Sequence, residues 1–332
     1  MYTSVNQRIT QTPPLSRKGE DLSQQSHYQL RPLQRKRGLF CCMILVLTAL
    51  VIAGCGSPEQ QYVKKAVKLM DKRGLFAEGS AWKEARAKAL AAQPATMDEA
   101  YDICREALKV AGGKHSFIMA PVRDTTTYEE IAPEVSLLED NLIYAVLPAH
   151  TGVKVSDSLY VHTIFDFLQA HLDARGVIVD LRGNTGGNMY PMIASVSPLL
   201  PDGIVLKFQS RKQTSPIPLS YVTESCQLPA ESVVKYPSST PVAILTDDHT
   251  GSSGEATLIC FRGLDNVRTF GAPTAGYASG NMSYTLSDGY LFAITRSADV
   301  ARTGEVFCED PILPDVPTET PLADAIAWIA SL

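Results

Sequence analysis

The apolar positions of residues 60–112 recur at intervals of three and four, which is the spacing of one face of an α-helix. Three helices are predicted there. The first covers 60–70, the second covers 82–92 and is stopped by Pro94, and the third opens at the capping box 96–99 and stops at Gly112-Gly113. We therefore expect residues 55–112 to form a small helical region ahead of the main domain.

From residue 113 onward, short apolar runs alternate with amphipathic stretches. The apolar runs predict strands at 142–147, 176–181, 204–208, 242–246, 267–271 and a hairpin of 283–286 with 290–295. The amphipathic stretches predict helices at 156–174, 189–200, 256–263 and 322–329. Strands that alternate with helices predict an α/β core over residues 113–332, layered around a mostly parallel or mixed sheet.

The N-terminus has a different pattern. Residues 1–34 are polar and rich in Gln, Ser and Pro, which is typical of disorder. A basic cluster at 35–37 then precedes an apolar run at 39–53, shorter than the roughly 20 residues of a spanning helix. This order predicts a secretory signal. The long polar lead is unusual for such a signal and leaves the true start codon open.

The end of this signal, Ile52-Ala53-Gly54-Cys55, resembles a bacterial lipobox. The resemblance implies cleavage before Cys55 and lipidation of its thiol, so that residues 1–54 are a polar lead plus lipoprotein signal peptide. The folded part would then be tethered to a membrane of the bacterial cell envelope, outside the cytoplasm. An uncleaved N-terminal anchor is the alternative.

Composition excludes several classes of function. The chain has 332 residues and is 45% hydrophobic, which is ample for a core, and its net charge of −5 gives no reason to expect a nucleic-acid partner. It has no C-x-x-C motif and no histidine cluster, so neither a zinc site nor another cofactor is expected. The four cysteines after Cys55 permit disulfides but are widely spaced: Cys104, Cys226, Cys260 and Cys308.

Two glycine-rich loops follow predicted strands, at 183–187 and 251–254. The first matches neither dinucleotide-binding nor P-loop patterns, and its glycines fit either exposed backbone amides or a plain turn. The second lies between a buried strand and a helix, where Ser252 is a candidate nucleophile. The alternative is that Ser252 and Ser253 only cap the helix, and the G-x-S-x-G motif of other hydrolases is absent.

Residues 177–187, Val-Ile-Val-Asp-Leu-Arg-Gly-Asn-Thr-Gly-Gly, resemble the "IDLRGNPGG" signature of the C-terminal processing (tail-specific) serine peptidases. Three further pieces follow in that family's order: the serine turn at 242–255, a G-x-x-T-x-G at 271–276, and L-x-D-G at 286–289 with I-x-P-D at 312–315. The resemblance covers roughly residues 110–320 and implies a ClpP/crotonase-like core. It also implies that Ser252 is the nucleophile, with an oxyanion hole formed by the N–H of Ser253 and that of Gly183 or Asn184.

Two departures from the family change the mechanism that we expect. Tyr277 occupies the position of the lysine base of many members, and a phenol with an unperturbed pKa of about 10 is unsuited to that task. The segment after His115 is also too short for a PDZ domain. Lys114-His115-Ser116 resembles the His-Ser motif of the tricorn-type and nisin resistance branches, which implies that His115 is the general base.

Other residues near these motifs are weaker candidates. His249 is the second choice for the base, and no carboxylate that orients His115 is assignable. Glu309 has the wrong local spacing for that role, whereas Ser116 is a candidate for mediating such a contact. Glu255 fits a charge in the first turn of a helix as well as it fits a catalytic group.

The sequence thus predicts a membrane-anchored, extracytoplasmic serine endopeptidase that uses Ser252 and His115 without a metal or cofactor. The substrate would be a peptide bound in a cleft between the helical region and the core. The nisin resistance resemblance implies an antimicrobial, lantibiotic-like peptide. One alternative is a catalytically inactive lipoprotein that binds peptides or envelope ligands. The other is a general envelope protease with a Ser/Lys base, for which Lys114 is the nearest amine. The oligomeric state stays open.

Overall fold

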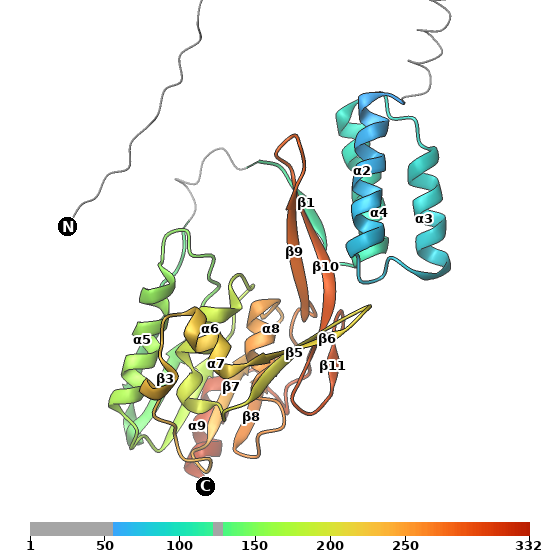
Figure 1. Cartoon of the computed structure of the whole chain (residues 1–332). Helices are drawn as coiled ribbons and strands as arrows, with labels where there is room; N and C mark the ends of the chain where they lie inside the picture. The colour runs from blue at the N-terminus through green and yellow to red at the C-terminus, as the bar shows by residue number, and fades with distance from the viewer. Residues whose placement is uncertain (1–55, 122–128) are drawn as a thin grey trace, which may run out of the picture. The chain divides into compact units, whose positions relative to one another are not determined.

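The computed structural model describes residues 56–121 and 129–332 (Figure 1). The expected signal sequence and Cys55 lie outside these residues. Across the two described ranges, no helix is both long and apolar enough to cross a membrane.

The helical region begins with three helices that run side by side (Figure 1): α2 (Pro58–Arg73), α3 (Gly79–Ala91) and α4 (Met97–Gly112). As the capping box predicts, the Thr96 hydroxyl accepts a hydrogen bond from Glu99 N at the start of α4. The apolar faces of the helices form one core, which also includes Phe292 and Ile294 from the main domain. The helices therefore pack against a strand and do not close their core alone.

A six-stranded sheet forms the centre of the main domain. Its strands are β2 (Glu134–Leu138), β3 (Leu142–Val146), β4 (Gly176–Asp180), β7 (Val242–Thr246), β8 (Val267–Gly271) and β12 (Val316–Pro317). They lie in the order β12-β8-β7-β4-β3-β2, and all pairs are parallel except β2–β3. Strands β4 and β7 are buried at every position, because helices cover both faces of the sheet.

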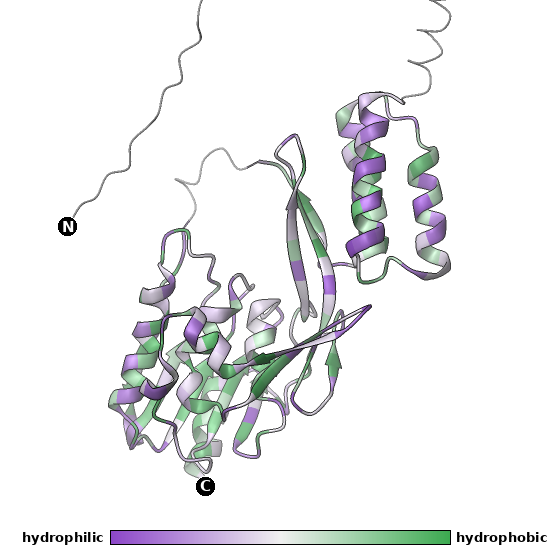
Figure 2. Ribbon diagram, viewed as in Figure 1, coloured by the Kyte–Doolittle hydropathy of each residue, from purple (hydrophilic) through white to green (hydrophobic). Residues whose placement is uncertain are grey.

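The side chains of β4 alternate between two apolar clusters. Val177 and Val179 belong to the larger cluster, whereas Ile178 belongs to a smaller one with Ile329. The smaller cluster is covered by α9 (Pro321–Ala330). Hydrophobic residues gather on the central strands, and hydrophilic residues gather on the outward faces of the helices (Figure 2). The helices of the larger cluster are α5 (Asp157–Ala170), α6 (Met189–Ser195), α7 (Leu219–Ser225) and α8 (Ser253–Ile259).

A second sheet is built on one long strand. Its strands are β1 (Phe117–Met119), β5 (Ile204–Ser210), β6 (Thr214–Pro218), β9 (Ser279–Thr285), β10 (Leu291–Val300) and β11 (Val306–Phe307). Strand β10 pairs antiparallel with β1, β5, β9 and β11, and one half of it packs on the helical region. Short 3₁₀ turns complete the described chain at Glu139–Asn141, Ser197–Leu199 and Ala230–Ser232.

The predicted α/β class with a mixed sheet is confirmed, whereas several element boundaries were wrong. The hairpin is longer than predicted because polar residues such as Ser279 and Asn281 pair with β10. Helix α6 ends before the predicted residue 200, where Pro198 opens a 3₁₀ turn. Strand β6 escaped prediction because Pro216 and Pro218 interrupt it, which an edge strand tolerates.

The four cysteines carry free thiols. Cys104 and Cys260 are fully buried, as their apolar helix faces predict. Cys226 and Cys308 are half-buried.

The order of the central strands brings three loops to one edge. Strand β4 lies beside β7, with Asp180 opposite Leu245, and β7 lies beside β8, with Thr246 opposite Gly271. These strands are parallel, so the loops after them emerge together at their carboxyl ends, where α/β proteins bind ligands. The loops carry the glycine-rich signature, the serine turn and the G-x-x-T-x-G motif.

Candidate active site

The two glycines that end the signature lie against the serine turn. Gly186 has φ +107°, and a Cβ there would come within 2.6 Å of the Cβ of Ser252. Gly187 has φ +121°, and its Cβ would meet the carbonyl oxygen of His150 at 1.9 Å. Both backbone conformation and space therefore require glycine. The Gly-Gly pair lets the first loop approach the side chain of Ser252.

Ser252 itself has a strained backbone. Its φ and ψ are 53° and −115°, a conformation that residues with a side chain rarely adopt. It directly precedes α8, and its side chain is partly exposed. Strain of this kind persists only where the surroundings hold it in place, and it gathers at functional sites. The conformation favours a nucleophile over the simple helix cap.

The carboxylate of Glu255 holds the serine turn to the neighbouring loop. One oxygen accepts hydrogen bonds from the Thr274 hydroxyl and from Gly276 N at 2.9 Å. The other accepts from Ser252 N at 3.0 Å and from Tyr277 N at 2.7 Å. Glu255 is fully buried, and burial raises its pKa despite these four bonds. Its contacts assign it to positioning the turn, and they explain the threonine and glycine of the third motif.

His115 lies just beyond α4, and its ring is fixed by β9. Its Nδ1 lies 2.8 Å from the Ser279 hydroxyl, and its carbonyl accepts a hydrogen bond from Asn281 Nδ2 at 2.8 Å. The ring meets the Tyr277 ring edge-on, at 5.3 Å between centroids. Burial, with the nearby charge of Lys114, lowers the pKa of His115 to about 4, although a hydrogen bond to the backbone of Ser279 opposes this shift. The imidazole is therefore neutral at physiological pH.

His115 and Ser252 line the same pocket, which has a volume of about 850 Å³. In the part of the chain that the structure describes, no hydrogen bond joins the two side chains directly. Residues near each of them in the sequence or the fold also line this pocket, among them Ser253, Gly187, Tyr277 and Ser279. A histidine and a serine that are separated by 137 positions in the sequence are thus brought to one cavity.

The amides of Gly183 and Asn184 already have acceptors. Gly183 N donates to both carboxylate oxygens of Asp247 at 3.0 Å, and Asn184 N donates to Leu181 O at 3.1 Å. Neither residue lines the pocket. The expectation that one of them faces the oxyanion therefore does not fit these contacts.

Gly187 and Ser253 offer a different pair of donors. Both line the pocket, and no hydrogen bond between described residues uses the N–H of either. The Ser253 hydroxyl donates to the carbonyl of Gly187 at 2.6 Å, which ties the two backbones together. A pair of free amides held in this way beside Ser252 is the arrangement that a developing oxyanion requires.

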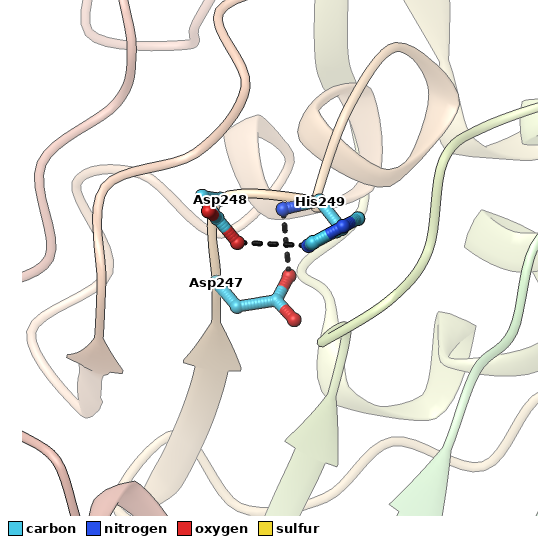
Figure 3. A group of neighbouring side chains, drawn as sticks. All are labelled: Asp247, Asp248 and His249. Carbon is cyan, nitrogen blue, oxygen red and sulfur yellow. Dashed lines mark hydrogen bonds and ion pairs between the residues drawn. The ribbon is translucent and has the colours of Figure 1, made fainter.

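The loop before the serine turn is shaped by Asp247 (Figure 3). Its Oδ1 accepts hydrogen bonds from His249 N and from both N and Oγ1 of Thr250. His249 is exposed, its ring pairs with Asp248 at 2.8 Å, and it does not line the pocket. The atoms of Asp247, Asp248 and His249 that could bind a metal ion lie within 4.8 Å of one another. Because Asp247 accepts hydrogen bonds from backbone N–H groups, we assign this cluster to stabilising the loop. The exposure of His249 and its position outside the pocket do not support a role as the base.

The other residues near His115 do not touch its ring. Lys114 is exposed, and its Nζ donates to Ala275 O at 3.1 Å. Glu309 accepts from Lys114 N at 2.6 Å, and the Ser116 hydroxyl exchanges hydrogen bonds with Thr295. The ring partner is instead Ser279, which no motif of the sequence indicated. Only its place three residues after Gly276 connects it with the site.

The chain is similar in sequence to a known peptidase family and to one of its curated relatives. The family model described as Peptidase family S41 matches residues 156–318. The nisin-resistance protein of Lactococcus lactis subsp. lactis is 36% identical over 281 residues, covering 82% of this chain and 87% of the relative.

Solved structures show the same similarity. A lipoprotein from Streptococcus agalactiae has a TM-score of 0.72 at 29% identity, covering 83% of this chain and 98% of that one. The photosystem II D1 C-terminal processing protease has a TM-score of 0.56 at 14% identity, covering 79% and 93%, which is a likeness of fold alone.

Proposed function

Because the chain belongs to peptidase family S41, we propose that it is a serine endopeptidase in which Ser252 attacks the scissile carbonyl and His115 is the general base. The observation that carries the proposal is that the strained serine and the neutral histidine line one pocket. His115 lies outside the residues that the family model matches, so its role rests on its position in the fold.

The surroundings of His115 suit a base. If Nδ1–H donates to the Ser279 hydroxyl, Nε2 keeps its lone pair for the proton of Ser252. Catalytic hydrogen bonds are often long without substrate and tighten in the complex, so the missing direct bond is compatible with this role. As the proton moves, the amides of Ser253 and Gly187 would bind the oxyanion. His115 then returns the proton to the leaving amine.

The structure offers less support for a lysine base. Lys114 donates to a backbone carbonyl, and its Nζ lies 4.7 Å from the centroid of the Tyr277 ring. Both contacts engage the amine with groups other than Ser252. Lys114 also does not line the pocket, so the alternative of a Ser/Lys protease has no contact in its favour.

A fluorophosphonate probe tests the serine mechanism directly. We expect the native protein to be labelled and the label to map to the peptide that contains Ser252, because the probe reacts only with an activated serine. Heat-denatured protein is the control and should stay unlabelled. An unlabelled native protein, with its fold intact by circular dichroism, would favour the inactive peptide-binding lipoprotein.

For the substrate, we propose an antimicrobial peptide of the lantibiotic type. The support is the name of the relative, a nisin-resistance protein, together with its 36% identity over most of both chains. The pocket is large and partly open, and it is lined by the edge of a hairpin, which suits a peptide chain. Incubation of nisin with the protein, followed by mass spectrometry, identifies any bond that is cleaved.

For the location, we propose that Cys55 carries a lipid that holds the protein on the outer side of a bacterial membrane. The support is the lipobox-like sequence and the similarity to a Streptococcus agalactiae lipoprotein. We expect Cys55→Ser to abolish incorporation of an alkyne-palmitate label in cells, since it removes the acceptor thiol. Cys226→Ser is the control and should keep the label. Equal labelling of Cys55→Ser and the native protein would contradict the anchor.

A further inference from the structure

The side chain of a buried acid in the pocket, Asp299, has no hydrogen-bond partner among the residues that the structure describes. Asp299 lies in β10 and is 1% exposed. No hydrogen bond or ion pair between described residues uses either of its carboxyl oxygens, and Oδ1 is fully enclosed. A buried polar group without a partner is unfavourable and is uncommon in folded proteins. The position of Asp299 therefore calls for an explanation.

Asp299 belongs to the wall that also carries Ser252. Ser297 and Asp299 are two residues apart on a regular part of β10, so their side chains point to the same face of the sheet. Both line the pocket, as does Ala256 from the second turn of α8. Ser297 is only 8% exposed, so the two side chains form a recessed polar part of the cavity.

The charged groups of Glu255 and Arg296 do not offset the unfavourable burial of the Asp299 carboxyl. Burial raises the pKa of Asp299 well above its usual value, and the carboxyl of Glu255 adds to this effect. The other charged residue of the pocket wall is Arg296, whose guanidinium lies 3.1 Å from the sulfur of Met282, a side chain that is half exposed. The basic group thus sits beside an exposed side chain, and the acid sits in the recess. A cation bound beside Asp299 would offset the effect of burial and favour the ionised carboxyl.

Asp299 is not part of the proposed proton relay. His115 and Ser279 bond to each other, and neither bonds to Asp299. The backbone of Asp299 pairs with Phe208 of β5 and Phe307 of β11, and its N–H lies 3.3 Å from Ala278 O, but no hydrogen bond between described residues uses its side chain. Oδ1 is enclosed and Oδ2 is not, so Oδ2 is the carboxyl oxygen that a ligand in the pocket can reach.

We propose that Asp299 and Ser297 form a subsite that binds a cationic substrate side chain, lysine or arginine, in the pocket of Ser252. The proposal rests on the proposed peptidase function. A carboxylate at the bottom of a specificity pocket selects cationic residues in serine peptidases of another fold. The hydroxyl of Ser297 supplies a second acceptor, which suits an ammonium or guanidinium group with several N–H donors.

Binding of p-aminobenzamidine, an aromatic amidine cation, tests the subsite without catalysis. We expect saturable binding to the Ser252→Ala protein, followed by its fluorescence, and binding about tenfold weaker when Asp299→Asn is added. Asp299→Asn keeps the shape of the side chain and removes the charge. Asp265→Asn, at an exposed acid outside this pocket, is the matched control and should leave binding unchanged. Equal binding to the Asp299→Asn and control proteins would overturn the proposal.

Cleavage of a peptide library tests the same subsite in the active protein. We expect the native protein to prefer lysine or arginine over glutamine by about tenfold at one substrate position. Asp299→Asn should lose this preference and still cleave the glutamine peptides. A native protein without a cationic preference, or a variant that keeps it, would contradict the subsite.

Two further outcomes separate the proposals from one another. A protein that binds the amidine but cleaves nothing would contradict the peptidase function and leave the cation site standing. If Asp299→Asn does not fold, Ser297→Ala gives the second test. It removes one acceptor and should weaken amidine binding about threefold. No change with Ser297→Ala would then overturn the proposal.

Discussion

Replacing Ser252 by alanine is expected to lower kcat/KM for peptide cleavage by about 10⁴-fold or more. The substitution removes the only atom that forms a bond to the scissile carbonyl in the proposed mechanism, so neither the histidine nor the oxyanion donors can act on a covalent intermediate. Substrate affinity should change little, because the pocket walls stay in place. Cleavage of a quenched fluorescent peptide gives the rate, and binding of the same peptide gives the affinity.

Ser253→Ala is the matched control, because it removes a hydroxyl from the next residue. The Ser253 hydroxyl donates to the carbonyl of Gly187, while its proposed contribution to catalysis is the backbone N–H, which alanine keeps. We expect a loss of about fivefold, as for one neutral hydrogen bond of about 1 kcal/mol. If Ser252→Ala keeps most of the activity, Ser252 is not the nucleophile. If Ser253→Ala is then inactive, Ser253 is the nucleophile instead, and the assignment is refuted.

Replacing His115 by alanine is expected to lower kcat/KM by roughly 10³- to 10⁴-fold. Without the imidazole, no group is placed to take the proton of Ser252, because Tyr277 is a phenol and Lys114 is bound to a carbonyl. The loss should appear in kcat, since His115 acts on the reacting atoms and not on distant parts of the substrate.

Lys114→Ala is the control for this experiment. It removes the neighbouring amine and should keep at least about one third of the native activity, as expected for an exposed side chain outside the pocket. The reverse pattern, with His115→Ala active and Lys114→Ala inactive, would establish the Ser/Lys alternative.

The pH profile of the native protein follows from the same histidine. A base acts in its neutral form, and the lowered pKa of about 4 means that His115 stays neutral until the pH falls well below 6.5. We expect kcat/KM to stay level from neutral pH down to about 5 and to fall with a midpoint near 4. A midpoint at the unperturbed value of 6.5 would show that the base is exposed to solvent or is a different histidine.

The tyrosine at the family's lysine position has a structural explanation. The Tyr277 ring lies against both the imidazole of His115 and the ammonium of Lys114, and its backbone N–H is held by Glu255. The loop that carries a lysine base in other members therefore supplies a wall for the histidine in this chain. In the proposed mechanism, the base comes from the segment after α4 instead of from this loop.

Motif order predicted the fold class well, and it is the basis for proposing Ser252 as the nucleophile. In β4 and β7 the polar residues Asp180 and Thr246 stand only at the last position, so the apolar runs before them indicate buried strands plainly. The loops after these strands carry their candidate catalytic residues in consecutive positions. The second donor of the oxyanion hole was predicted less well. The signature contains several glycines, and only contacts such as that of Gly183 with Asp247 distinguish a bound amide from a free one.

The sequence alone determined the central α/β sheet and the helices, because burial patterns and caps are local. It also singled out Ser252 and His115 as the candidate nucleophile and base, because short motifs carry both residues. The tertiary structure decided which groups meet. Parallel neighbours β4 and β7 bring the two loops together, and the pairing of β9 with β10 sets Ser279 against His115. It also decided that the Asp299 side chain is buried in the pocket of Ser252 with no hydrogen-bond partner among the described residues, because burial depends on every element packed around it.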